Sequence, residues 1–414
     1  MEFDVISVIG LGYIGLPTAA AFAARRKHVI GVDVNQHAVD TINKGAIHIV
    51  EPELDMLVHA AVTQGYLRAT VTPEPADAFL IAVPTPFLEG FKPDLSYIEA
   101  ASRAISPVLK AGNLVVLEST SPVGATEQMA AWMAELRPDL TFPQQAGESS
   151  DIRIAHCPER VLPGHVIREL VENDRVIGGA TPRCSELARE LYQIFVQGEC
   201  ILTDARTAEM CKLTENSFRD VNIAFANELS VICDELDINV WELIRLANRH
   251  PRVSILQPGP GVGGHCIAVD PWFIVDSAPE LARLIRMARV VNDDKPRYVI
   301  DRIERAAKRF KEPVIACLGL AFKANIDDLR ESPAVDIARE IGLRFGGQVM
   351  VVEPNIRKLP DSLEGVVRFS ELNDALNEAD VIVILVDHVQ FKRVDPVRLQ
   401  AKVVIDTRGL LSRG

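Results

Sequence analysis

Apolar and β-branched residues gather in short runs in the first half of the chain, and helix-length segments separate these runs. The runs cover residues 4–10, 28–33, 78–84, 113–120, 152–159 and 174–179. Short runs of this composition are typical of buried strands. Strands that alternate with helices form parallel sheets, because each parallel pair needs a long crossover. The first half is therefore predicted to contain a parallel sheet.

The pattern changes at about Thr203. From there to Asn248 apolar residues recur at helical spacing without any proline or glycine, which predicts a long helical section. Strand-like runs return at residues 313–322, 348–354, 366–369, 379–387 and 402–409. We predict an α/β fold in which two Rossmann-like parallel-sheet domains, residues 1–202 and 301–414, are joined by a central helical domain, residues 203–300.

Composition narrows the classes of function. The chain has 414 residues, 48% of them hydrophobic, and a net charge of −13. This charge argues against a nucleic-acid partner, which needs a basic surface. No apolar run reaches the roughly 20 residues that span a bilayer, and the N-terminus lacks a signal-peptide pattern, so we expect a cytoplasmic protein with no membrane partner. The seven cysteines show neither metal-ligand nor disulfide spacing, and no metal is expected.

A glycine motif follows the first apolar run. Gly10, Gly12 and Gly15 have GxGxxG spacing between a predicted strand and a predicted helix, and the next strand ends in Asp33. In dinucleotide-binding folds the glycines allow a tight turn and close approach of the pyrophosphate, and the acid binds the ribose. This context predicts an NAD site, because an acid at that position favours NAD over NADP.

Two threonines lie where such sheets bind ligands. Thr85 and Thr120 each follow an apolar run, at the carboxyl end of a predicted strand. Each is equally consistent with a plain turn residue. The sequence leaves both readings open.

The segment GPGVGGHCIAVDP, residues 259–271, surrounds Cys266 with glycine and proline. Glycines remove side-chain bulk where something must approach the backbone. A thiol beside such a loop is either a small buried hydrophobe, the usual role of a cysteine outside disulfides, or a nucleophile. Asp270, four residues on, is a possible partner for Cys266.

Polar residues recur on the predicted central helix at a spacing close to 3.6. Lys212, Asn216 and Arg219 share one face, and Asn227 lies near it. Such a stripe is either a solvated face or a functional one. A partly desolvated lysine there could act as a base or hold an anion, since burial lowers a lysine pKa.

Four basic residues lie beside glycine, proline or asparagine in predicted loops: Arg160, Arg252, Lys323 and Arg330. Each alone is most simply a surface charge. Together they could neutralise a diphosphate in an otherwise acidic protein, and loops are where binding residues concentrate.

Six motifs carry a resemblance over almost the whole chain: GLGYIGLP, ESTSPVG, CPERVLPG, AEMCKLTENSFRDVNIAFANE, GPGVGGHCIAVDP and GLAFKANIDDLRESPA. In this order they resemble the nucleotide-sugar 6-dehydrogenase family, and within it the branch acting on UDP-N-acetylhexosamines. The resemblance implies a four-electron oxidation of the sugar C6 alcohol to a carboxylate with two NAD. UDP-N-acetyl-D-mannosamine is the expected substrate, and its uronate would feed bacterial surface polysaccharides such as enterobacterial common antigen. The gluco and galacto epimers are the alternatives.

The resemblance also implies roles for residues. Cys266 would capture the intermediate aldehyde as a thiohemiacetal, which is oxidised to a thioester and hydrolysed. Lys212 resembles the family's catalytic lysine, and Asn216, Asp270, Thr120 and Glu159 lie near the reacting water or the proton transfer. The cofactor contacts expected from the motif and the resemblance are Gly10, Gly12, Tyr13, Ile14, Gly15, Asp33, Thr85, Thr126 and Arg330.

Substrate contacts are implied by the same resemblance. Besides Lys212 and Asn216 they are Arg160, Val161, Arg219, His250, Arg252, Gly263 and Lys323. The C-terminal domain has GLAF where the first has GLGYIG, so the uridine nucleotide is assigned there. A homodimer is expected, built on the apolar central helices, with Arg252 reaching the neighbouring active site.

One departure and two competing interpretations remain. The UDP-glucose branch has roughly PEFLREG where this chain has PERVLPG, so Pro163 replaces a carboxylate. A two-electron β-hydroxyacid dehydrogenase also joins an NAD domain to helices, but it needs no cysteine. An NAD-sensing protein would need neither Lys212 nor Cys266.

Overall fold

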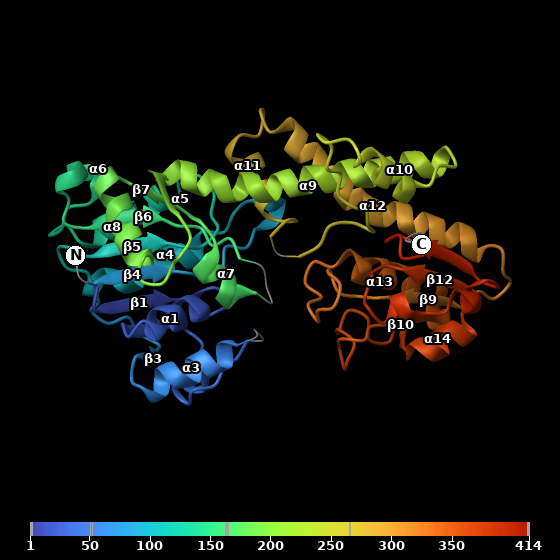
Figure 1. Cartoon of the computed structure of the whole chain (residues 1–414), viewed down its shortest axis with the longest axis horizontal. Coiled ribbons are helices and arrows are strands. Elements are labelled where there is room, and N and C mark those ends of the chain that lie inside the picture. Colours follow the sequence, from blue (N-terminus) through green and yellow to red (C-terminus); the bar gives the residue numbers. More distant parts are fainter. Residues whose placement is uncertain (1–2, 50, 52, 162–164, 265, 412–414) are drawn as a thin grey trace. The chain divides into compact units, whose positions relative to one another are not determined.

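The computed structural model describes residues 3–411 except residues 50, 52, 162–164 and 265 (Figure 1). The chain divides into two compact units. The first comprises residues 1–215 and 272–277, and the second residues 216–271 and 278–414. The division into three domains stays a prediction.

The first unit is built on a sheet in which eight strands of the described residues are ordered β3-β2-β1-β4-β5-β6-β7-β8. Neighbouring strands are parallel except β6 and β7, which pair antiparallel over two residue pairs. The strands are β1 Val5–Ile9, β2 His28–Val32, β3 Leu67–Thr70, β4 Ala78–Ile81, β5 Leu114–Leu117, β6 Arg153–His156, β7 Arg175–Gly179 and β8 Cys200–Asp204. The sequence prediction of a wholly parallel sheet is therefore wrong at this one pairing.

Helices cover both faces of this sheet, because successive strand residues point to opposite sides. Ile6 and Val8 of β1 enter one apolar core and Ile9 enters the other. The helices are α1 Gly15–Ala24, α2 Gln36–Asn43, α3 Leu54–Thr63, α4 Ser96–Ile105, α5 Ala125–Leu136, α6 Pro143–Ala146, α7 Val166–Glu172 and α8 Pro182–Tyr192. The order of the strands reverses at β1 and β4, and ligands of such sheets bind at that point.

The predicted helical section consists of α9 Ala205–Glu235 and α10 Val240–Ala247. The break between them has a local cause. Asp237 adopts a left-handed φ of 54°, and the Asn239 side chain caps α10 by accepting from the amides of Trp241 and Glu242. Two further helices follow, α11 Asp270–Ser277 and α12 Arg283–Ala307. None of the described helices is long and apolar enough to cross a membrane.

The second unit contains a five-stranded sheet with the order β11-β10-β9-β12-β13, and all neighbours in it are parallel. The strands are β9 Ile315–Leu318, β10 Val349–Val352, β11 Arg368–Phe369, β12 Val381–Ile384 and β13 Val403–Asp406. The helices α13 Pro333–Phe345 and α14 Leu372–Glu378 belong to this domain. Two Rossmann-like sheets joined by a helical section confirm the predicted fold class.

Candidate active site

In the first unit the glycine motif forms the turn from β1 to α1. Gly10 has a φ of 91°, and a Cβ there would lie 2.6 Å from the carbonyl oxygen of Ala82. A Cβ on Gly15 would collide with the carbonyl of Gly10, whereas one on Gly12 would meet no atom within 4 Å. Gly10 and Gly15 are thus required for the close backbone packing of the turn. Gly12 leaves the open space that a pyrophosphate needs.

Asp33 follows β2 and faces this turn. Its Oδ2 accepts a hydrogen bond of 2.9 Å from the amide of Leu11, and its Oδ1 one of 2.8 Å from the amide of Asn35. The residue is half-buried, so carboxylate lone pairs remain for ribose hydroxyls. Tyr13 is exposed, and Ile14 is the N-cap residue of α1, where no side chain caps the helix. These residues fit NAD, which a helix N-terminus favours through its amides.

The three threonines are all engaged by the protein. The Thr85 hydroxyl donates to the carbonyl of Thr120, which joins the ends of two neighbouring strands. The Thr126 hydroxyl donates to Oε1 of Glu209 at 2.6 Å, and the Thr126 amide donates to the same oxygen at 2.8 Å. The turn interpretation of Thr85 and Thr120 therefore has a concrete basis, and their ligand contacts stay predictions.

Glu159 lies in a buried charged cluster just beyond β6. Arg175 forms an ion pair with it at 2.9 Å, and the side chains of both are less than a tenth exposed. Burial raises the pKa of the neighbouring Glu118 to about 7, although Arg175 and a hydrogen bond from Tyr192 oppose the shift. The Arg175 guanidinium also lies over the Tyr192 ring, 4.9 Å from its centroid. The buried ion pair with Arg175 thus fixes the position of the Glu159 side chain.

The two residues that follow Glu159 make different contacts. The Arg160 amide donates to Oε1 of Glu159 at 2.7 Å, and its guanidinium pairs with Glu215 at 2.7 Å. Val161 is half-buried and packs on the core of the first unit. Pro163, the departure from the UDP-glucose branch, lies outside the described residues.

In the second unit Cys266 is exposed, whereas Cys157, Cys184, Cys233 and Cys317 are buried. The core interpretation of Cys266 is therefore wrong. Among the described residues no cysteine forms a disulfide.

Asp270 lies one helical turn beyond the cysteine. Its amide donates to the Cys266 carbonyl at 2.9 Å, and its Oδ2 accepts from Nδ2 of Asn216 at 2.5 Å. Asp270 and Asn216 are only 4% and 3% exposed, so the hydrogen bond between them is sheltered from water. The structure brings together three of the predicted catalytic residues within this unit.

The polar stripe of α9 is mixed in exposure. Lys212 is half-buried and Arg219 exposed, but Asn227 is fully buried. The Asn227 amide group donates to Asn292 at 2.8 Å, and its Oδ1 accepts from the amide of Gly259 at 2.9 Å. Asn227 therefore anchors the start of the glycine loop, which is a structural role.

The glycine loop is packed too tightly for side chains. A Cβ on Gly263 would collide with the carbonyl of Glu331, and one on Gly264 would lie 2.9 Å from the ring of Phe322. Gly264 also has a φ of 85°. The loop is thus fixed against residues 322–333, the segment that carries Lys323 and Arg330.

The remaining predicted contacts are exposed: His250, Arg252, Lys323 and Arg330. Arg330 forms an ion pair of 2.7 Å with Asp328. Their exposure leaves them accessible to a ligand, and their contacts with substrate or cofactor stay predictions.

Sequence reasoning missed several buried polar groups that support the predicted site residues. Arg289 of α12 donates to Asp220 at 2.7 Å, and Asn292 donates to the same oxygen at 2.8 Å. Together with Asn227 they tie α9 and α12 to the glycine loop. The helical spacing of Arg289, Asn292 and Lys295 among apolar residues was the available signal. Arg175, the ion-pair partner of Glu159, belongs to no motif, and Glu118 lies in the motif ESTSPVG but was given no role.

Family models match the chain in three parts. The NAD binding domain of the UDP-glucose/GDP-mannose dehydrogenase family matches residues 4–196, its central domain residues 206–294 and its UDP binding domain residues 316–413.

Similar proteins cover nearly the full length. An NDP-N-acetyl-D-galactosaminuronic acid dehydrogenase of Ralstonia nicotianae is 72% identical over 100% of this chain and 97% of its own length. A UDP-N-acetyl-D-mannosamine dehydrogenase of Escherichia coli (strain K12) is 65% identical over 99% of this chain and 100% of its own. The solved structure of a UDP-D-ManNAc dehydrogenase from Pyrococcus horikoshii is 40% identical, with a TM-score of 0.89 over 99% of this chain and 96% of that one.

Proposed function

The chain belongs to the UDP-glucose/GDP-mannose dehydrogenase family and is an NAD-dependent dehydrogenase, and we propose that it oxidises the C6 alcohol of a UDP-N-acetylhexosamine to the carboxylate. The observation that carries the proposal is the exposed Cys266 next to the buried Asn216–Asp270 hydrogen bond. An accessible thiol can hold an aldehyde covalently between two oxidations.

The first unit would hold the cofactor at Gly10, Gly12, Tyr13, Ile14, Gly15 and Asp33. NAD, when bound, accepts a hydride in each of two oxidations. A second oxidation needs a covalent or hydrated aldehyde, because a bare aldehyde carbon has no alcohol to oxidise. The protein's own part is therefore to supply a nucleophile and to move protons.

Cys266 is the proposed nucleophile. Its thiolate sulfur bonds to the aldehyde carbon, and the oxygen takes a proton to give a thiohemiacetal. Loss of a hydride and that proton leaves a thioester, and water then displaces the thiol to release the carboxylate. Asp270, oriented by Asn216, would hold or deprotonate the water, and Lys212 would steady the alkoxide charge that develops in the transition state. Thr120 and Glu159 would complete the surroundings of this water.

The nucleotide is proposed to bind the second unit. The UDP binding domain model matches there, and Lys323, Arg252 and Arg219 offer exposed cations for a diphosphate. Arg160, Val161, His250 and Gly263 would line the sugar, and Arg330 the pyrophosphate of NAD.

The acetamido group and the epimer are separate questions. The choice of UDP-N-acetyl-D-mannosamine rests on resemblance alone, and a relative of 65% identity is named for that substrate. The galacto epimer is a second candidate, because a relative of 72% identity is named for N-acetyl-D-galactosaminuronic acid. The uronate product would feed surface polysaccharide synthesis in either case.

A panel of substrates tests the proposal. UDP-N-acetylmannosamine, UDP-N-acetylgalactosamine, UDP-N-acetylglucosamine and UDP-glucose are each incubated with NAD, and NADH and product mass are read. We expect two NADH and one uronate per sugar and the highest kcat/KM for an acetamido sugar. A pocket with polar donors for the acetamide discriminates strongly against sugars that lack it. UDP-glucose as the best substrate, or one NADH per sugar, would refute the proposal.

A cysteine substitution tests the covalent step. Cys266→Ser should stop uronate formation while some NADH still forms, because an oxygen ester is formed and cleaved less readily than a thioester. Cys200→Ser, on the half-buried edge strand β8, is the matched control and should keep full activity. Uronate at the wild-type rate from Cys266→Ser would instead favour a mechanism without the thioester.

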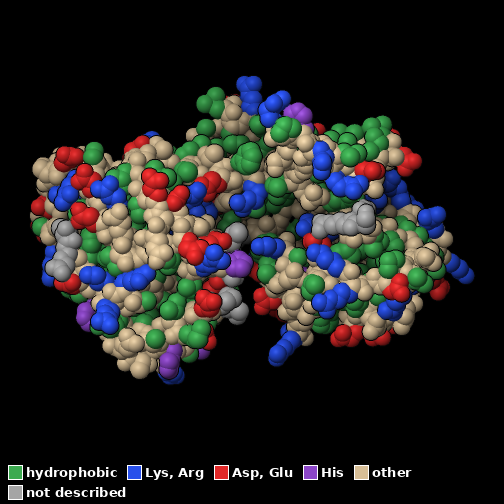
Figure 2. All heavy atoms as spheres, in the orientation of Figure 1, with side chains coloured by type: hydrophobic (Ala, Val, Ile, Leu, Met, Phe, Trp, Pro, Cys, Tyr) green, Lys and Arg blue, Asp and Glu red, His purple; other side chains and the backbone are tan. Residues whose placement is uncertain are grey.

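A homodimer completes the proposal. Large apolar side chains on the second unit's part of α9 and just beyond its end are exposed, among them Phe218 (69%), Phe225 (52%) and Leu236 (61%), and Figure 2 shows hydrophobic side chains at the surface over α10. Apolar surface of this extent is typical of an interface. Arg252 would reach the partner's site. A monomeric mass by light scattering, together with full activity of that monomer, would contradict the homodimer.

A further inference from the structure

The second sheet holds a buried carboxylate at the place where the first sheet holds Asp33. Glu353 follows β10 and is only 3% exposed. Its Oε2 accepts from the amides of Leu320 at 2.7 Å and Ala321 at 3.1 Å, and its Oε1 accepts from the amide of Asn355 at 3.0 Å. Asn355 adds a side-chain bond to Oε1 at 3.1 Å. Little capacity is left for a ribose hydroxyl.

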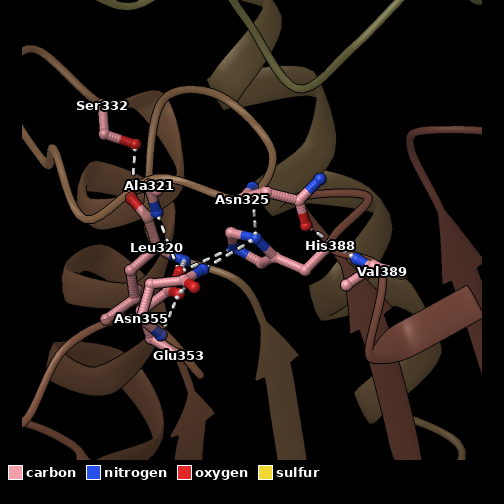
Figure 3. A network of polar contacts seen from close by, with 8 residues as sticks. All are labelled: Leu320, Ala321, Asn325, Ser332, Glu353, Asn355, His388 and Val389. Carbon is pink, nitrogen blue, oxygen red and sulfur yellow. Dashed lines mark hydrogen bonds and ion pairs between the residues drawn. The ribbon is translucent and has the colours of Figure 1, made fainter. Parts of the chain in front are cut away.

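His388 completes this arrangement from the segment after β12 (Figure 3). Its side chain is fully buried, and its Nε2 lies 2.9 Å from Oε2 of Glu353. Its Nδ1 accepts from the amide of Asn325 at 2.8 Å. A backbone amide can only donate, so Nδ1 carries no proton at this contact and Nε2 is the donor to Glu353.

Asn325 is held by two hydrogen bonds, one from its amide and one to its side chain. Besides its amide bond to His388, its Oδ1 accepts from the amide of Val389 at 2.9 Å. Its φ of 64° is left-handed, a conformation that asparagine tolerates better than most residues. At the far end of the segment the Ser332 hydroxyl donates to the carbonyl of Leu320 at 2.6 Å.

Lys323 lies between these fixed points. Leu320 and Ala321 are held by Glu353 on one side, and Asn325 is held by His388 on the other, while Lys323 itself is exposed. The backbone of this cation is therefore set by the buried network. Preorganisation of this kind improves affinity because less freedom is lost on binding.

We propose that His388 is a positioning residue for the nucleotide, which closes Glu353 to a ribose and fixes the Leu320–Asn325 segment so that Lys323 meets the diphosphate of UDP. The proposal rests on the proposed function, which assigns UDP to this unit. It explains why the acid at this place is open to the ribose of NAD in the first sheet but closed to a ribose in the second.

The test measures the affinities of two ligands separately by calorimetry, UDP alone and NAD alone. His388→Phe removes the ring's hydrogen bonds with Glu353, Asn325 and Asn355. We expect the Kd for UDP to rise about tenfold, the worth of one or two positioning bonds. The Kd for NAD should stay within about twofold, since all of its proposed contacts except Arg330 belong to the first unit. His388→Gln can still donate to Glu353 and should fall between the wild type and His388→Phe.

A core variant separates positioning from general loss of stability. Ile341→Ala in α13 empties part of the apolar core of the same domain and should lower Tm while leaving the Kd for UDP unchanged. If His388→Phe does not fold, His388→Gln and Asn325→Gly carry the test, because glycine keeps the positive φ and loses only the bond from Val389. A Kd for UDP in these variants equal to that of the wild type, or an equal rise for NAD, would overturn the proposal. A wild-type protein that binds NAD but not UDP would overturn the proposed function as well.

Discussion

The two sheets solve the same backbone problem in the same way. After the first strand of each, a glycine with a positive φ, 91° at Gly10 and 95° at Gly319, donates its amide to the carbonyl that ends the neighbouring strand. The next amide, of Leu11 or Leu320, then donates to an acid. The acid in turn accepts from the amide two residues further along.

The sheets differ beyond this shared turn. In the first, residues 10–14 lead directly into α1, and Asp33 is half-buried with lone pairs to offer. In the second, residues 319–332 intervene before α13, and Glu353 is enclosed by His388 and Asn355. The same turn is thus proposed to serve a ligand in the first sheet, whereas it holds a loop in the second. Backbone geometry alone does not determine which nucleotide binds.

Removing the acid should mainly lower stability in the second sheet and mainly weaken NAD binding in the first. The loss of stability in the second sheet is the largest effect expected. Glu353→Ala leaves a buried histidine, three backbone amides and the Asn355 side chain without their acceptor, so we expect a loss of about 3–5 kcal/mol in the free energy of unfolding. Asp33→Ala removes two backbone contacts at a partly exposed site and should cost only about 1 kcal/mol, while the Kd for NAD rises. Urea denaturation and NAD titration of both variants measure this.

Equal losses of stability would contradict the comparison, since they would mean that Asp33 is as structural as Glu353. An unchanged Kd for NAD in Asp33→Ala would contradict the ligand role. The wild-type protein in the same buffer is the reference for both variants.

The same contrast limits what the sequence could predict. Asp33 was predictable because strand, glycines, helix and acid follow one another within a short motif. Apart from Asn355, the partners of Glu353 lie more than 30 residues from it along the chain, and His388 belongs to no recognised pattern. Asn216 and Asp270 were named from a resemblance, but the hydrogen bond that joins them needs the folded chain.

The missed strands have a physical explanation as well. Leu67–Thr70 and Cys200–Asp204 are edge strands that each pair with one neighbour, so parts of both are exposed and their residues are mixed in polarity. The buried strands read as continuous apolar runs and were all found. The antiparallel pairing of β6 and β7 could not be predicted, because runs of residues do not show direction.

The two sheets also treat a buried glutamate differently, which gives a second prediction. Burial raises the pKa of Glu118 to about 7. Burial also acts on Glu353, but the hydrogen bonds from His388 and Leu320 outweigh it and lower the pKa. Between about pH 4.5 and 7 the folded state therefore binds the Glu118 proton more tightly than the unfolded state. Stability from this group is present at low pH and is lost as pH rises towards 7.

Glu118→Gln removes this titration and keeps an acceptor for the Tyr192 hydroxyl. From pH 5 to pH 8 the wild type should lose about 2–3 kcal/mol of unfolding free energy that the variant does not lose. Urea denaturation at both pH values gives the difference. Parallel profiles for the wild type and the variant would show that the pKa of Glu118 is not raised in the folded state, and would contradict this prediction.

The smallest expected change isolates the ligand role of one glycine in the first turn. Gly12→Ala adds a Cβ that meets no protein atom within 4 Å, at a backbone conformation open to any residue, so the Tm should not change. The added methyl would occupy space that a pyrophosphate needs, and we expect the Kd for NAD to rise about tenfold, or about 1.4 kcal/mol.

Gly347→Ala in the second unit is the matched control, because its Cβ also meets nothing within 4 Å. This variant should change neither the Tm nor the Kd for NAD. Gly10→Ala makes the opposite case, since its φ of 91° and the 2.6 Å approach to Ala82 should lower Tm whether or not NAD is present. If Gly12→Ala binds NAD as tightly as the wild type does, the pyrophosphate does not pass over this turn. The first sheet would then bind its nucleotide in some other way than its glycine motif predicts, and the contrast with the second sheet would rest on Asp33 alone.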